Sequence, residues 1–156
     1  MVISDNITKE ELDIFASLLK QDSAKGHYDK QFTDLAFNKN YLTHISNTSE
    51  IIGYPGSALI LVFRENNNPV CFAVVCSSLV PEFDSEILFF STLSHRRKKG
   101  FGEAAIKLIL EEVKGKSVLA RCIPKSKAMI RLLNRSGFNQ ITLSSSKNIN
   151  FVHQNC

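Results

Sequence analysis

Residues 87–112 read ILFFSTLSHRRKKGFGEAAIKLILEE and contain the clearest structural signal in the chain. The apolar run at 87–93 predicts a strand, and a basic loop with two glycines follows it. Beyond the glycines, apolar residues recur at i, i+3, i+4, i+7 and i+8, which predicts an amphipathic helix. The apolar positions of that helix are Phe101, Ala104, Ala105, Leu108 and Ile109. A strand, a glycine-containing loop and a helix in this order are typical of a phosphate-binding site.

The loop before this helix has the chemistry of an anion site. The N–H groups of a helix's first turn have no intrahelical partner, and the helix dipole adds partial positive charge. Gly100 and Gly102 let the backbone approach an anion closely. Arg97, Lys98 and Lys99 add full positive charges just upstream. We therefore expect this loop to suit a pyrophosphate.

Two other kinds of phosphate site fit this stretch less well. In the dinucleotide fingerprint a glycine follows the strand directly, and an acidic residue stands about 20 positions further on. Here four basic residues come first, and position 120 is alanine. The tripeptide Gly115-Lys116-Ser117 imitates the end of a P-loop, but position 110 is leucine and a helix precedes it instead of a strand.

The other segments predict a mixed order of strands and helices. Thr8 and Glu11 have the spacing of a capping box, which predicts the start of a helix. Two apolar runs around the polar turn 65–69 predict a β-hairpin. In chain order we expect strands at 2–4, 58–63, 70–79, 87–93, 117–123, 138–143 and 148–153, and helices after Thr8, over about 29–45, from 101 and over 127–136.

Length and composition indicate one globular domain over residues 1–156. Hydrophobic residues make up 44% of the chain, but no apolar run approaches the roughly 18 residues of a membrane span. The first residues lack a secretory pattern, so the expected compartment is the cytoplasm. The four cysteines predict buried thiols, and the scattered histidines predict no metal site.

The pattern Arg97-x-x-Gly100-x-Gly102 resembles the acyl-CoA-binding motif of the GNAT superfamily of N-acetyltransferases. The flanks agree, because a hairpin and a strand precede the motif, and a strand, a helix and the pair Gly137-Phe138 follow it. The resemblance spans roughly residues 2–153 and is closest over 86–138. It implies a single-domain α/β (α+β) fold, in which a mixed, mostly antiparallel sheet with a splayed strand pair is flanked by about four helices.

The resemblance also implies how acetyl-CoA is held as a co-substrate. The backbone at Thr92 and Leu93 would contact the thioester end, where an N–H group would polarise the carbonyl. Ser126 stands where an asparagine often opens the later helix, and its hydroxyl would cap that helix and bond the cofactor. The pyrophosphate would be held by Arg97, Lys98, Lys99, Gly100, Phe101 and Gly102.

Catalysis needs a base that takes a proton from the attacking amine. By the resemblance this base is Glu86, six positions before Thr92, with Asp84 as the nearby substitute. The alternative interpretation of Glu86 is a solvent-facing residue at a strand end. Leu133 replaces the tyrosine that often protonates the leaving thiolate. Three alternatives follow: another acid such as water, Tyr54 or a loop side chain; a thiolate that leaves unaided; or low activity.

The leading hypothesis is an acetyl-CoA-dependent N-acetyltransferase that transfers the acetyl group directly to an amine in a ternary complex. An acidic patch at 82–86 would suit a cationic small-molecule or protein amine. The net charge of +4 is concentrated at the cofactor loop, which argues against nucleic acid, with charged tRNA as the exception. The alternatives are a non-catalytic acyl-CoA-binding module and an acetyltransferase toxin acting on aminoacyl-tRNA. No membrane partner is expected, and the sequence leaves open whether the chain forms a homodimer.

Overall fold

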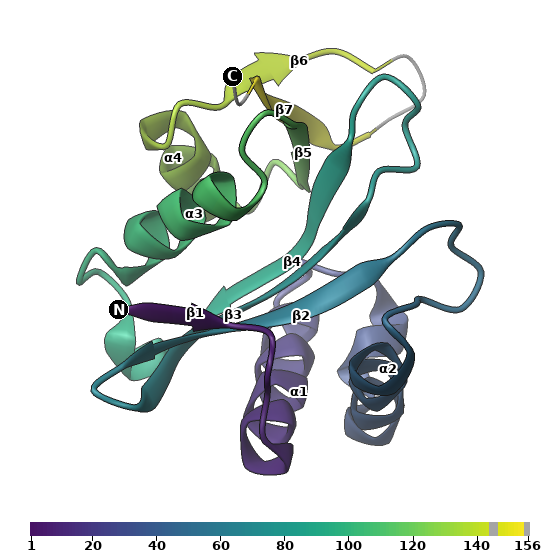
Figure 1. The fold of residues 1–156 in the computed structure, drawn as a ribbon, viewed down its shortest axis with the longest axis vertical. Helices are drawn as coiled ribbons and strands as arrows, with labels where there is room; N and C mark the ends of the chain where they lie inside the picture. Colours follow the sequence, from purple (N-terminus) through teal and green to yellow (C-terminus); the bar gives the residue numbers. More distant parts are fainter. Residues whose placement is uncertain (144–146, 155–156) are drawn as a thin grey trace.

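A seven-stranded sheet forms the centre of the computed structural model, which describes residues 1–143 and 147–154 (Figure 1). The strands are β1 (Val2–Ser4), β2 (Ala58–Glu65), β3 (Asn68–Ser77), β4 (Ser85–Thr92), β5 (Ser117–Cys122), β6 (Asn139–Ile141) and β7 (Ile149–Gln154). They lie in the order β1-β2-β3-β4-β5-β7-β6. Neighbouring strands are antiparallel except β4 and β5, which are parallel. The sheet is therefore mixed and mostly antiparallel, as predicted.

Helices cover both faces of this sheet. The helices are α1 (Lys9–Ala24), α2 (Leu35–Thr48), α3 (Phe101–Glu112) and α4 (Lys127–Arg135), with short 3-10 turns η1 (Lys30–Thr33) and η2 (Ser94–Arg96). The first two helices lie on one face and the last two on the other (Figure 1). Within the described ranges, no helix is both long enough and apolar enough to cross a membrane.

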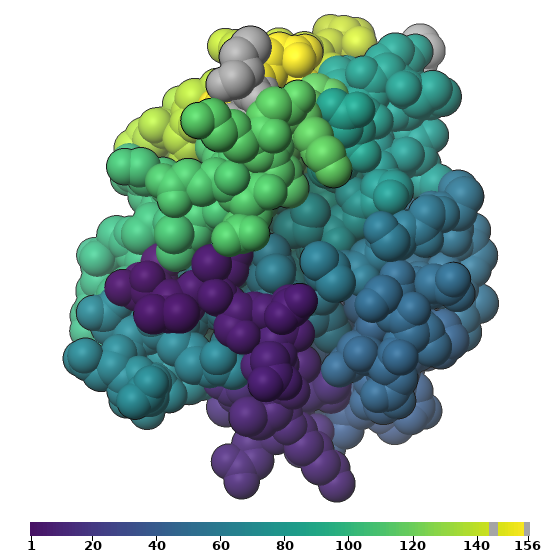
Figure 2. All heavy atoms as spheres, in the orientation of Figure 1, coloured from purple at the N-terminus to yellow at the C-terminus, as the bar shows by residue number. Residues whose placement is uncertain are grey.

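Two hydrophobic cores, one on each face, hold these layers together. On the α1–α2 face, Phe15 stacks against Phe72 with ring centroids 5.1 Å apart. On the α3–α4 face, Ile106, Ile109 and Leu133 are fully buried. In the space-filling view the N-terminal segment (purple) lies between the green α3 surface and the blue surface of the β2–β3 hairpin (Figure 2).

The start of α1 is capped as the sequence predicts. The Thr8 hydroxyl accepts a hydrogen bond from Glu11 N at 3.1 Å, and Glu11 Oε1 accepts one from Thr8 N at 2.9 Å. The helix predicted over about 29–45 is instead η1 followed by α2. Asp34 separates the two because its backbone is extended, and its carboxylate accepts a hydrogen bond from Phe37 N at 3.1 Å.

The predicted hairpin is confirmed with a tighter turn. Asn66 and Asn67 have φ values of 51° and 65°, in the left-handed region that asparagine tolerates better than most residues. Two such residues match the right-handed twist of the flanking strands. As a result β2 continues to Glu65 and β3 begins at Asn68.

The α3 helix is confirmed, but its buried face is rotated from the predicted one. Ala104 is exposed, whereas Ile106, which the predicted stripe omitted, is fully buried beside Ala105 and Ile109. Many neighbouring residues of this helix are apolar, so the periodicity alone did not determine which of two adjacent positions lies at the centre of the buried face. Packing against the sheet and α4 decided it.

Candidate active site

The parallel strands β4 and β5 separate after a short contact. Their register pairs Ser85 with Val118 and ends at Ile87 with Ala120, although β4 continues to Thr92 and β5 to Cys122. Beyond this point each strand loses its neighbour on that side, which opens a gap in the middle of the sheet. The predicted splayed strand pair is therefore confirmed.

A β-bulge in β4 determines which side chains face the α1–α2 side of this gap. Val74 of β3 pairs with Phe89, whereas Val75 pairs with Ile87, so Leu88 is the extra residue. In a regular strand Glu86 and Phe89 would point to opposite faces. The bulge brings both to one face, where they line the same cavity.

The backbone of β4 has polar groups that point into the gap. Leu93 N donates to Val70 O of β3 at 3.0 Å, so the alternating antiparallel pattern directs the N–H and C=O groups of Phe90 and Thr92 away from β3. The Tyr28 hydroxyl donates to Phe90 O (3.0 Å) and accepts from Phe90 N (3.3 Å). Thr92 N is therefore the better candidate for the predicted thioester contact, because Leu93 N is already used within the sheet.

The loop before α3 presents unpaired backbone N–H groups. Helix α3 starts at Phe101 without a side-chain cap, and its first backbone bond runs from Ala104 N to Gly100 O. The N–H groups of residues 101–103 are thus free of intrahelical partners. Gly100 has φ +82°, and a Cβ there would meet no heavy atom within 4 Å, so open space surrounds it. A Cβ at Gly102 would instead lie 3.2 Å from Leu132 of α4, so this glycine permits close helix packing.

The basic residues of the loop divide into two groups. Arg97 turns back toward the sheet, where its Nε donates to Thr92 O at 3.0 Å and Nη2 lies 3.5 Å from the carboxylate of Asp22. Asp22 also accepts a hydrogen bond from Ser91 at 2.9 Å. Lys98 and Lys99 are exposed beside the start of α3. Arg97 therefore holds the loop on β4, whereas the two lysines place positive charge beside the free N–H groups of α3.

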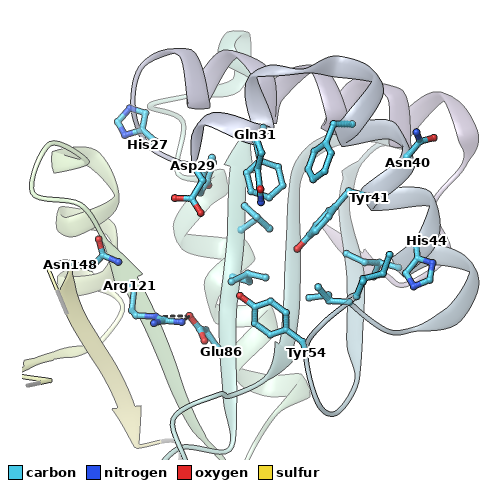
Figure 3. Close-up of a pocket in the computed structure, with 18 of the residues that line it drawn as sticks. His27, Asp29, Gln31, Asn40, Tyr41, His44, Tyr54, Glu86, Arg121 and Asn148 are labelled. Atoms are coloured by element: carbon cyan, nitrogen blue, oxygen red, sulfur yellow. Dashed lines mark hydrogen bonds and ion pairs between the residues drawn. The ribbon is translucent and has the colours of Figure 1, made fainter. Parts of the chain in front are cut away.

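A cavity of about 700 Å³ lies on the α1–α2 face, and Glu86 and Arg121 line one side of it (Figure 3). Glu86 is only 2% exposed, so the solvent-facing interpretation is wrong. Arg121 binds Glu86 Oε1 through Nε at 2.8 Å and Nη2 at 2.7 Å, while Oε2 has no hydrogen-bond partner among the described residues. Burial raises the pKa of Glu86, and the Arg121 guanidinium partly opposes that rise.

Asp84 does not join this cavity. Its exposed carboxylate accepts hydrogen bonds from Ser117 N at 2.8 Å and from the Ser117 hydroxyl at 3.2 Å. Glu82 is also exposed and is not among the residues that line the cavity. The acidic patch predicted over 82–86 therefore does not gather at one place, and Glu86 is the better candidate for the base.

Comparisons with known proteins identify this architecture. No family model and no curated protein matches the sequence. A solved structure assigned to the GNAT family of acetyltransferases, from Desulfovibrio desulfuricans, matches with 12% identity and a TM-score of 0.70 over 99% of both chains. The chain has the GNAT fold.

Two further structures with this fold hold a cofactor. The yncA protein of Salmonella typhimurium, solved with acetyl-CoA, matches with 14% identity and a TM-score of 0.69 over 99% of this chain and 93% of that one. AAC(6')-Ib, solved with ribostamycin and coenzyme A, matches with 14% identity and a TM-score of 0.70 over 98% of this chain and 92% of that one. At these identities the likeness establishes the GNAT fold.

Ser126 departs from one role that the sequence suggested for it. Ser126 occupies the N-cap position of α4 but makes no side-chain cap; its hydroxyl instead lies 2.6 Å from His27 Nδ1. The prediction that Ser126 caps this helix is therefore wrong. Leu133 is fully buried in the α3–α4 core. The Tyr28 hydroxyl is the phenol that lies on the gap edge of β4, where it contacts the backbone of Phe90.

Sequence reasoning missed two residues of the site, Arg121 and Asp22. Arg121 is the one charged residue in the otherwise apolar run 118–123, and an isolated charge in a buried strand usually has a buried partner. Asp22 follows an apolar helical stripe and gave no comparable signal. Their partners lie 35 and 75 residues away along the chain, so only the fold reveals them.

The cysteines behave as apolar side chains. Cys71, Cys76 and Cys122 are free and buried, as predicted, and burial raises the pKa of Cys122 to about 12. Cys156 lies outside the described residues. Among the described residues, no three His, Cys, Asp or Glu side chains gather in a way that could hold a metal ion.

Proposed function

We propose that this protein is an acetyl-CoA-dependent N-acetyltransferase that transfers an acetyl group directly to an amine in a ternary complex. The observation that carries the proposal is the gap between β4 and β5. It has the uncapped start of α3 at one end and a buried carboxylate in a cavity at the other. The GNAT fold supports it, because structures with this fold hold acetyl-CoA or coenzyme A.

The anion loop suits the pyrophosphate of coenzyme A. The free N–H groups of residues 101–103 and the helix dipole attract anions, and Lys98 and Lys99 add two charges beside them. We assign the arm of the co-substrate to the open edge of β4. There Thr92 N would donate to the thioester oxygen and stabilise the negative charge that develops on it.

Glu86 is our proposed base. Its free Oε2 would accept a proton from the acceptor ammonium, directly or through a water molecule. The nitrogen lone pair then forms the C–N bond, the C–S bond breaks, and the sulfur leaves with the electron pair. The second amine proton goes to the medium or to the departing sulfur. Burial alone favours the neutral form of Glu86. Arg121 would lower the pKa of Glu86 and so increase the fraction of the carboxylate that is ionised and can accept a proton.

Tyr28 is our proposed donor to the leaving sulfur. Burial raises its pKa to about 12, far above the roughly 8.5 of an ordinary thiol. Full proton transfer from Tyr28 to a thiolate is therefore unfavourable, and we assign it hydrogen bonding instead, for which its single O–H would turn from Phe90 O to the sulfur. Tyr54, whose pKa is also raised by burial, lies on the acceptor side of the same cavity.

Two measurements test the proposal. Calorimetry with acetyl-CoA should show saturable binding that a Lys98→Glu, Lys99→Glu variant weakens, and absence of binding would overturn the whole assignment. A thiol-release assay with a panel of amines should then show coenzyme A release that depends on the amine. Binding without release from any amine would identify a non-catalytic acyl-CoA-binding module instead.

A further inference from the structure

The cavity beside Glu86 has a wall built from packed aromatic rings. Phe32 and Phe89 meet edge to face with centroids 4.9 Å apart, and Tyr41 packs against Phe32 at 5.2 Å. Phe32 and Phe89 are almost fully buried, which fixes this wall in place. Tyr28 extends it by an edge-to-face contact with Phe89 at 4.9 Å. Such a surface favours a flat or branched apolar group of the ligand.

Apolar side chains also line the outer part of the cavity, together with the polar Asn40 and His44. Phe37 packs near Tyr41 with centroids 6.0 Å apart and is 38% exposed, so it lies at the opening. Ile52, which also lines the cavity, is 80% exposed. Figure 3 shows the hydroxyls of Tyr41 and Tyr54 pointing into the space between these walls. The whole volume of about 700 Å³ is in the range for a small organic molecule.

The charges of the cavity suit one amine and not several. Glu86 is the buried carboxylate, and the Arg121 guanidinium offsets its charge. Asp29, the other carboxylate among the described lining residues, is exposed. A polycation would have to desolvate several ammonium groups against a nearly neutral, aromatic wall, which costs free energy that no further buried carboxylate returns. One ammonium can instead meet the free Glu86 Oε2.

We infer that the acceptor is a compact monoamine that carries an aromatic ring, with the ring on the wall of Phe32, Tyr41 and Phe89 and the amine at Glu86. This inference rests on the proposed function, because it names the acceptor of the same reaction. It narrows what the acidic patch predicted, a cationic small-molecule or protein amine, because a polyamine or an aminoglycoside needs a concentration of negative charge that this cavity lacks.

A thiol-release assay compares four acceptors: tryptamine, 2-phenylethylamine, spermidine and kanamycin. A peptide with an N-terminal alanine serves as a fifth. We expect kcat/KM for the two aryl amines to exceed that for the other three by about tenfold or more, the ratio that roughly 1.4 kcal/mol of differential binding gives. A higher kcat/KM for spermidine, kanamycin or the peptide would overturn the inference and leave the proposed function intact.

Binding of tryptamine can be measured without catalysis. The chain contains no tryptophan, so indole fluorescence excited beyond the absorption of tyrosine reports the ligand alone. We expect a saturable blue shift with the protein, in the presence or absence of coenzyme A. If tryptamine binds but no amine releases coenzyme A, the inferred site stands and the proposed activity fails. If no shift appears, the inference fails whatever the activity.

A surface variant and a matched control locate the site. Phe37→Ala removes a partly exposed ring from the opening and should raise the tryptamine Kd and KM severalfold, while values for spermidine stay the same. Leu59→Ala removes a side chain of similar exposure (45%) on β2, outside the cavity, and should change neither. Equal effects of the two variants, with unchanged melting temperatures, would contradict the assignment.

Discussion

Glu86 and Arg121 meet beside the point where β4 and β5 part, with Arg121 Nη2 2.7 Å from Glu86 Oε1. Both guanidinium contacts go to the same oxygen, which leaves Oε2 free to accept a proton. Burial raises the pKa of Glu86, and without Arg121 that rise would be unopposed. Arg121 thus favours the ionised form that the proposed base needs.

Replacing Glu86 should separate binding from chemistry. In Glu86→Gln the amide oxygen can still accept from Arg121, but the group cannot take a proton. We expect kcat to fall by about 100-fold, a usual contribution of a general base, with the Kd for acetyl-CoA unchanged. Thiol release and calorimetry measure the two quantities. Asp84→Asn is the control, since Asp84 contacts Ser117 and should have little effect on kcat. An intact rate in Glu86→Gln would remove Glu86 from the mechanism.

Arg121 should set the pH at which the proposed reaction begins. Burial raises the pKa of Glu86 and Arg121 lowers it, so Arg121→Gln leaves the rise unopposed. The base works only when deprotonated, and the acidic limb of kcat/KM should therefore move to higher pH, with partial recovery of the rate at alkaline pH. The exposed Arg135→Gln, whose partner Glu103 is also exposed, is the control. An unmoved limb, or one shifted to lower pH, would contradict the role of Arg121.

Two glycines with the same backbone conformation should differ in their effect on coenzyme A binding. Gly100 and Gly115 have φ of +82° and +84°, and a Cβ at either meets no atom within 4 Å. Alanine at each should cost about 1–2 kcal/mol of folding free energy, the strain of a left-handed residue, which urea unfolding measures. Only Gly100→Ala should also weaken acetyl-CoA binding, because its relaxation redirects the N–H groups at the start of α3. Equal affinities for the two variants would place the pyrophosphate elsewhere.

Removing the Tyr28 hydroxyl should slow the reaction. In Tyr28→Phe the ring still packs on Phe89, but the donor beside the gap is lost. We expect kcat to fall by about 100-fold, the lower end of the effect of losing one donor to a developing anion. Tyr41→Phe changes another phenol of the cavity wall and should leave kcat near that of the parent. A Tyr28→Phe rate equal to the Tyr41→Phe rate would mean that the sulfur leaves without this donor.

Glu11 should stabilise the fold in a pH-dependent way. Its carboxylate binds Arg64 at 2.7 and 2.6 Å, and the hydrogen bonds from Arg64 hold the pKa of Glu11 below its usual 4.5 despite opposing desolvation. The stabilisation is present above the unfolded pKa and is lost as pH falls through the folded one. Glu11→Gln should thus lose about 1–3 kcal/mol in urea unfolding at neutral pH, and the difference should shrink in acid. The exposed Glu10→Gln should show no such loss.

The sequence alone determined most of the elements of this protein and the glycine loop before α3. The capping box at Thr8, the asparagine turn of the hairpin and the glycine loop before α3 are local features, because each depends on residues a few positions apart. Such spacings can be read directly from the sequence, and the structure contains all three features.

The tertiary structure alone decided what surrounds the gap. The bulge at Leu88 turns Glu86 toward the cavity, and the parallel register with β5 brings Arg121 to it. Neither the bulge nor the strand register has a sequence signature. A shift of one residue moves every side chain of a strand to the opposite face, and the neighbouring strands determine which register forms. Asp84, two residues before Glu86, lies ahead of β4 and contacts Ser117 instead of the cavity. Packing against the sheet and α4 likewise decided that the buried face of α3 passes through Ile106 and not Ala104.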